Sequence, residues 1–255
     1  AAVIKDGSDN DVTSNYNITY VDGTLAVTQR TLEITSASDN KPYDGSALTN
    51  TVSSITDGDL ATGHTYTATV TGTQTNVGTS TNVVSAAVIK DGSDNDVTSN
   101  YNITYVDGTL AVTQRTLEIT AASDTKVYDG TALTNTVSSI TDGTLATGHT
   151  YTATVTGTQT NVGTSTNVVS SAVIKDASDN DVTSNYNITY VDGTLEVIQS
   201  SIEITAASDN MPYDGTALTN TVSSITDGDL ATGHTYTATV TGTQTNVGTS
   251  TNVVS

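Results

Sequence analysis

The residues best suited to chemistry in this sequence are clustered aspartates. Residues 91–96 read DGSDND, and gathered carboxylate and carbonyl oxygens are the ligands that calcium prefers. An EF-hand is excluded, because the copy that starts at Asp6 has Asp11 where that loop needs glycine and Asn17 where it needs glutamate. A calcium site of another kind remains open, and the alternative is a solvated turn. The candidate ligands are Asp91, Asp94 and Asp96, with their equivalents Asp6, Asp9 and Asp11, and Asp176, Asp179 and Asp181.

Other reactive side chains are isolated from one another along the chain. His64, His149 and His234 recur without a second histidine, a cysteine or a group of acids nearby, so the sequence does not indicate a zinc site. Serine and aspartate are too abundant to indicate a catalytic triad, which is recognised by its geometry. We therefore predict a protein that is not an enzyme and has no cofactor apart from the calcium candidate.

Charge and composition argue against several classes of binding partner. The net charge is −20 with only 7 Lys and Arg residues, which argues against nucleic acid and against anionic membrane surfaces. No stretch approaches the roughly 18 apolar residues of a membrane span, so we expect no membrane insertion. There is no cysteine, which excludes disulfides. Threonine, valine, isoleucine and tyrosine are common and strong helix formers are scarce, which favours β-strands.

An internal repeat sets the domain organisation. The segment that begins at Ala2 recurs at Ala87, and a near copy begins at Ala172, so the period is 85 residues. This length suits one small β-domain for each repeat. We expect small β-sandwich or β-grasp-like domains, arranged end to end as a rod, in an all-β protein.

A change of phase marks the domain boundaries. Apolar residues fall at odd positions in Leu25 and Val27 but at even positions in Leu32 and Ile34, and a one-residue shift sends strand side chains to the opposite face. We therefore place boundaries after residues 29, 114 and 199. The segments are an incomplete head (1–29) with last strands only, a first repeat (30–114), a second repeat (115–199) and a tail (200–255) that lacks its last strands.

Alternation predicts the strands of the first repeat. Asp107-Gly108 between two alternating segments predicts a hairpin, because such a turn needs positive φ angles. One short helical turn is expected, in SNY (99–101) or VSSIT (52–56). Threonine occupies every second position from 65 to 75, and we expect this row to face water; an ice-binding face would need many such rows side by side. The predicted strands are 31–35, 47–52, 64–70, 82–90, 101–106 and 109–114.

Three motifs support a family resemblance. KPYDGSALTNTV, LATGHTYTATVTGTQTNVGTSTN and DVTSNYNITYVDGTLAVT together resemble the YDG-type tandem repeats of bacterial cell-surface, adhesin-like proteins. The resemblance covers every repeat and implies an extracellular, non-catalytic β-module on the bacterial surface. The last copies depart from the pattern, since methionine replaces a lysine at Met211 and alanine replaces a glycine at Ala177. Similar surface proteins sometimes carry Lys–Asn isopeptide bonds, for which the repeated lysines Lys5, Lys90 and Lys175 are the candidates.

Two functions follow as hypotheses. The first is a structural stalk or fibre whose partners are neighbouring repeats or other chains of the same protein. The alternative is an adhesive domain that binds a glycan or a host protein. The 29 residues of the head and the 56 of the tail add up to one 85-residue repeat. Two explanations stay open: strand addition between chains, giving a head-to-tail filament, or a fragment of a longer array.

Overall fold

β-strands make up nearly all the regular structure of the computed structural model, which describes residues 1–255. The only helical elements are three single 3₁₀ turns, η1 (Thr13–Asn15), η2 (Thr98–Asn100) and η3 (Thr183–Asn185). The all-β prediction is therefore confirmed. None of these turns has the length or the apolar character that a membrane-crossing helix requires.

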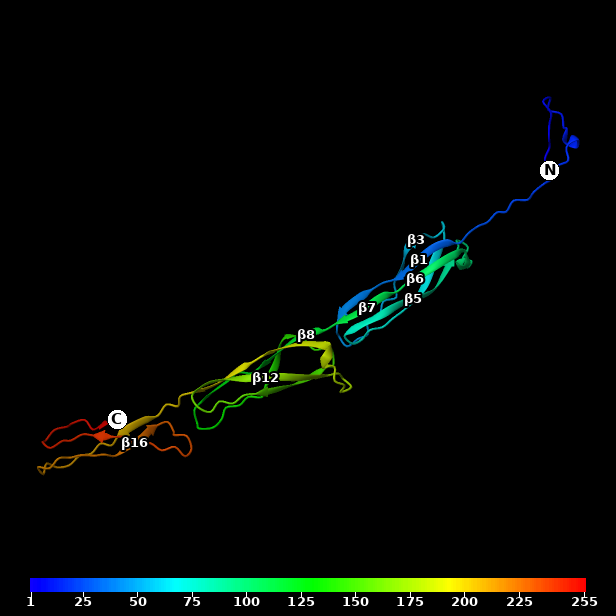
Figure 1. Ribbon diagram of the computed structural model, residues 1–255. Coiled ribbons are helices and arrows are strands. Elements are labelled where there is room, and N and C mark those ends of the chain that lie inside the picture. The colour runs from blue at the N-terminus through cyan, green and yellow to red at the C-terminus, as the bar shows by residue number, and fades with distance from the viewer. The chain divides into compact units, whose positions relative to one another are not determined.

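The chain divides into two units, and the division runs through the first repeat. The first unit contains residues 1–37, 51–71 and 83–108, and the second contains residues 38–50, 72–82 and 109–255. The second repeat lies wholly in the second unit, where Figure 1 labels its strands β8 and β12. It therefore shows the arrangement of a whole repeat within one unit.

Two sheets build the second repeat. In the first sheet β8 lies between β10, to which it is antiparallel, and β13, to which it is parallel. In the second sheet the order is β11-β12-β14-β9, with β14 antiparallel to β12 and parallel to β9. The strands are β8 (Arg115–Ala121), β9 (Asp124–Val127), β10 (Ser138–Gly143), β11 (Thr150–Thr156), β12 (Gly163–Lys175), β13 (Tyr186–Val191) and β14 (Gly193–Ile198).

The first repeat has the same strand orders, β3-β1-β6 and β2-β7-β5-β4. Its strands are β1 (Arg30–Ser36), β2 (Asp39–Pro42), β3 (Ser53–Gly58), β4 (Thr65–Thr71), β5 (Gly78–Lys90), β6 (Tyr101–Val106) and β7 (Gly108–Thr113). The tail contains two short antiparallel pairs, β15 (Glu203–Ala206) with β16 (Ser223–Asp227) and β17 (Val240–Thr241) with β18 (Val253–Val254). The head contains η1 and one β-bridge, between Lys5 and Asp11.

Five of the six predicted strands are confirmed, and one is wrong. Residues 47–52 form no strand, apart from a bridge between Leu48 and Gln74. Of the two places considered for a helical turn, the one at η2 is confirmed, and residues 53–56 belong to β3. The sequence also gave no sign of β2, because this four-residue strand has no apolar alternation and is held by its parallel pairing with β7.

The predicted hairpin at Asp107-Gly108 is also wrong. β6 pairs with β1 and β7 pairs with β2, so the chain crosses here from one sheet to the other. Gly108 is needed for close approach and not for a positive φ, because a Cβ on it would lie 2.5 Å from the carbonyl oxygen of Ala37. Asp107 accepts a hydrogen bond from the Val84 amide at 2.9 Å and so helps to fix the crossing.

The threonine row faces solvent as predicted. In β4 the threonines are exposed, whereas Tyr66 and Ala68 are partly buried and Val70 is buried. Strand β11 repeats this pattern in the second repeat. The β-branched threonines therefore favour the strand without contributing to the core.

The buried residues form three clusters. The first unit has one core, and the second unit has a large cluster and a small one that contains Leu133, Leu195 and Val197. The predicted phase change is visible in the large cluster, where Leu110 and Val112 of β7 are buried and so are Leu117 and Ile119 of β8. This cluster joins residues of both repeats, which differs from the expectation of a separate interior for each. Only Gln114 separates β7 from β8, so their apolar faces stay close together.

Candidate functional site

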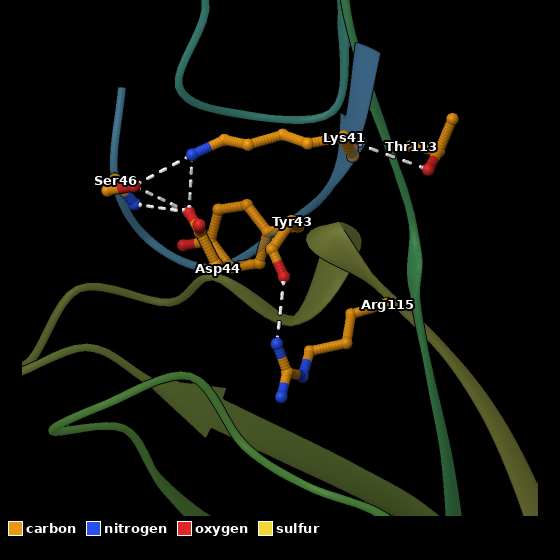
Figure 2. A network of polar contacts seen from close by, with 6 residues as sticks. All are labelled: Lys41, Tyr43, Asp44, Ser46, Thr113 and Arg115. Carbon is orange, nitrogen blue, oxygen red and sulfur yellow. Dashed lines mark hydrogen bonds and ion pairs between the residues drawn. The ribbon is translucent and has the colours of Figure 1, made fainter. Parts of the chain in front are cut away.

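The site begins at the YDG turn that follows β2, residues Tyr43, Asp44 and Gly45. The Asp44 carboxylate accepts hydrogen bonds from the Ser46 amide at 2.8 Å and from the Lys41 ammonium at 2.7 Å. Figure 2 shows both groups directed at this carboxylate. The Lys41 contact, helped by the bonds from Ser46, lowers the pKa of Asp44 to about 2. Gly45 has a φ of 82°, which favours glycine, so the motif specifies a rigid turn.

The turn places Tyr43 against the second repeat. Only 3% of Tyr43 is exposed, and its ring lies edge-on to that of Tyr186 with the centroids 5.6 Å apart. The centroid of the His149 ring lies 5.8 Å from that of Tyr43. Burial raises the pKa of the Tyr43 phenol, and Tyr186 adds to this effect. The first repeat therefore inserts an aromatic side chain into the core of the second.

The second repeat holds its side of this contact with hydrogen bonds. The Tyr186 hydroxyl accepts a bond from the Ala146 amide at 3.0 Å and is bonded to Nδ1 of His149 at 2.9 Å. A Cβ on Gly45 would lie 3.3 Å from Nε2 of the same histidine. Glycine is therefore favoured at the third position of the motif for two reasons: the positive φ of its backbone and the closeness of the His149 ring.

Polar groups join the two repeats beside the aromatic contact. Asn185, which is 4% exposed, accepts a hydrogen bond from the Val77 amide at 2.8 Å and donates one to Oδ1 of Asn76 at 3.1 Å. The Arg115 guanidinium donates to the backbone carbonyl of Tyr43 at 3.3 Å, as Figure 2 shows. We call this set of contacts around Tyr43, His149, Asn185 and Tyr186 the junction.

Copies of these residues elsewhere in the chain show how their burial depends on the neighbouring repeat. Tyr128 lies against His234 of the tail, with the centroids 5.9 Å apart, and is only partly buried. Tyr213 of the tail is 66% exposed. On the receiving side Asn100 is exposed, whereas its counterpart Asn185 is buried. The junction is therefore complete only where a YDG turn meets a whole repeat.

The candidate calcium ligands form hydrogen bonds and ion pairs with residues close to them in the sequence. Asp91 accepts hydrogen bonds from the Ser93 and Asn95 amides, and the Asn95 side chain is the main cause of its lowered pKa. Asp94 forms an ion pair with Lys90 at 3.0 Å, and Asp96 accepts a bond from the Thr98 amide. No group of three or more acidic or imidazole side chains is placed to hold a metal ion. Calcium binding thus stays a prediction from sequence. The same contacts recur for Asp6, Asp9 and Asp11, and for Asp176, Asp179 and Asp181.

The histidines and lysines have roles that the sequence did not indicate. His149 was expected to be isolated, yet it completes the junction; its fixed position after a glycine in each repeat was the available signal. For the isopeptide hypothesis, Lys175 pairs with Asp179, while buried Asn167 donates to the carbonyls of Ala122 and Asn135. The repeated lysine and this asparagine are therefore held by different partners.

Replacing Lys41 with methionine tests the electrostatics of the turn. We expect the pKa of Asp44 to rise from about 2 toward its ordinary value of 3.8, because the ammonium is its largest stabilising contact. A depressed pKa stabilises the fold above about pH 4, and this stabilisation is lost as the pH falls toward 2. The variant should lose less than about 1 kcal/mol at pH 7, because the pair is partly exposed and screened by solvent.

An NMR titration of the Asp44 carboxyl group measures this change directly. The natural reference is Asp214, whose turn already carries Met211 in place of the lysine and whose pKa is lowered by hydrogen bonds from Thr216. An unchanged pKa in Lys41→Met would show that the ammonium does not hold the carboxylate.

No protein-family model matches this chain, and neither does any curated protein.

Proposed function

We propose that this chain is a structural stalk module of a bacterial surface protein, extracellular and non-catalytic, whose repeats are joined through the YDG turn. The observation that carries the proposal is the burial of Tyr43 against His149 and Tyr186 of the following repeat. The surface location rests on the resemblance of the three sequence motifs to repeats of that class.

The mechanical role of the junction is to limit movement between neighbouring repeats. Each YDG turn that meets a whole repeat removes one tyrosine ring from water, and burial of a large apolar side chain is worth about 1.5–3 kcal/mol. The hydrogen bonds of Asn185 with the Val77 amide and of Arg115 with the Tyr43 carbonyl fix the orientation of this contact, because both involve the backbone of the first repeat. A connection of one residue, Gln114, leaves little freedom for bending between β7 and β8. Repeat number would then set the reach of the protein.

Small-angle scattering on chains with added copies of residues 115–199 tests this function. For a stalk, each inserted copy should increase the maximum particle dimension by the same step. Growth with the cube root of chain length would instead indicate a compact particle and would overturn the proposal. Chains with Tyr43→Ala and Tyr128→Ala serve as controls, because a loosened junction should broaden the distance distribution without changing the chain length.

A further inference from the structure

The His149 ring lies within the junction and is only partly buried, so protons can reach it from solvent. Its Nε2 edge faces the YDG turn, where a Cβ on Gly45 would lie 3.3 Å from Nε2 and 3.8 Å from Cε1. Its Nδ1 atom lies 2.9 Å from the Tyr186 hydroxyl. Histidine is the side chain that ordinarily changes its charge between about pH 5 and 8. A change of charge on this ring therefore takes place inside the contact between the two repeats.

The hydrogen bonds of the Tyr186 hydroxyl require the neutral form of His149. A hydroxyl has one hydrogen to donate and lone pairs with which to accept. The Ala146 amide uses a lone pair at 3.0 Å, because an N–H only donates, and the hydroxyl hydrogen is left for Nδ1. Nδ1 can accept it only when it has no proton of its own. The neutral ring, with its proton on Nε2, therefore satisfies the hydroxyl of a tyrosine that is only 4% exposed.

Protonation of His149 removes this acceptor. An imidazolium ring has a hydrogen on each nitrogen and accepts no hydrogen bond. The Tyr186 hydroxyl must then turn its hydrogen away from Nδ1, and the structure offers it no other acceptor. A buried donor that is left without a partner costs more free energy than the lost bond had contributed. The charged ring therefore opposes the closed junction.

Asp176 is the carboxylate that favours the charged ring. It faces the imidazole from the loop after β12, and its pKa is lowered mainly by the Asn180 side chain, with a smaller contribution from His149. This carboxylate already accepts hydrogen bonds from the Asn180 amide and side chain at 2.9 and 3.0 Å. Its attraction for an imidazolium ring is screened by solvent and salt, because it lies at the surface. The hydrogen bond lost inside the junction therefore decides the direction of the effect.

The other charged groups of the junction do not reverse this direction. Asp44 faces the Tyr43 phenol and is held by the Lys41 ammonium at 2.7 Å. The Arg115 guanidinium, which donates to the Tyr43 carbonyl, adds positive charge and so opposes a further positive charge. The Tyr43 phenol stays neutral in this pH range, because burial raises its pKa above the ordinary value of 10.0. His149 is therefore the group whose change of charge acts on the contact.

We propose that His149 is a pH-sensitive latch of the junction, which is closed while the ring is neutral and loosens when the ring takes up a proton. This inference rests on the proposed function and adds a means of regulating it. The open junction takes up the proton more readily than the closed one, so the closed form loses stability as the pH falls. A stalk with this latch is stiff near neutral pH and more flexible in mild acid.

Hydrogen exchange of the Val77 amide tests the latch on the full chain, because this amide is bonded across the junction to Asn185. The reference is the Leu133 amide, which is bonded to the Gln159 carbonyl within the second repeat. The ratio of the two exchange rates removes the direct effect of pH on exchange. From pH 8 to pH 5 the protection of Val77 relative to Leu133 should fall at least about tenfold, the size expected for a buried donor without a partner. The midpoint should coincide with the titration of the His149 ring signals in NMR spectra.

His149→Asn separates the proton from the rest of the ring, because the asparagine side-chain oxygen can replace Nδ1 as an acceptor and does not titrate. In this variant the relative protection of Val77 should be the same at pH 8 and pH 5. His64→Asn is the matched control. In the first unit the Tyr101 hydroxyl makes the same bonds to His64 and to the Ala61 amide, so this variant should keep the full pH response at Val77.

Three results would overturn the inference. One is a relative protection of Val77 that stays constant or rises as the pH falls, which is measured on the parent chain and needs no variant. Another is a fall with a midpoint away from the titration of His149, and the third is a fall that persists in His149→Asn. None of the three decides the stalk function, whose test varies the repeat number at one pH. An unprotected Val77 amide at pH 8 would instead show an open junction and overturn both.

Discussion

Tyr43→Ala is expected to lower the free energy of unfolding by about 3 kcal/mol, the lower end of the range for removing a buried aromatic ring. The ring is 3% exposed and lies between the YDG turn and the pair formed by His149 and Tyr186. Its loss leaves a cavity at the point where the two repeats share a core. Urea denaturation followed by circular dichroism measures the change, with a second transition expected if the two repeats unfold separately.

The chain contains its own control for this experiment. Tyr213 occupies the same position of the same motif but is 66% exposed, so Tyr213→Ala should change the stability of the single chain by less than about 0.5 kcal/mol. Equal losses in the two variants would mean that the tyrosine stabilises its own turn, and the junction would then not be the source of the effect.

Asn167→Asp is expected to cost about 4 kcal/mol at pH 7, in the range for a buried charge without a partner. Asn167 is 0% exposed, and its amide donates to the carbonyls of Ala122 and Asn135. A carboxylate of the same shape can donate to neither and would place its charge beside two acceptors. Gly157 lies close against this side chain, because a Cβ on it would lie 2.7 Å from Oδ1 of Asn167.

The loss in Asn167→Asp should depend on pH. Burial and the two carbonyls favour the neutral form, so the pKa of the new carboxyl group should lie above its ordinary value in the folded state. The unfolded state then ionises more readily, and the destabilisation grows as the pH rises through this range. The stability difference from the parent chain should therefore narrow as the pH falls toward 4. Asn187→Asp, at an exposed position of β13, is the control and should show little change at any pH.

The sequence by itself determined the local features of this protein. The 85-residue period follows from the recurring segments, and five of the six predicted strands, the exposed threonine face of β4 and the change of phase at Gln114 follow from alternation along the chain. Alternation is a property of each strand's own backbone, because successive side chains point to opposite faces. The alternation can therefore be recognised in the sequence without knowing which strand is the partner.

Only the tertiary structure decided which strands are partners and what the YDG turn does. Gly108 was predicted to be a hairpin glycine, but the carbonyls that require it belong to Ser36 and Ala37, which are distant in the sequence. β2 exists because β7 lies beside it, and Tyr43 is buried because His149 and Tyr186 of the next repeat are there to cover it. These features depend on hydrogen bonds and contacts between segments about 70 to 140 residues apart, and a local pattern does not identify the partner.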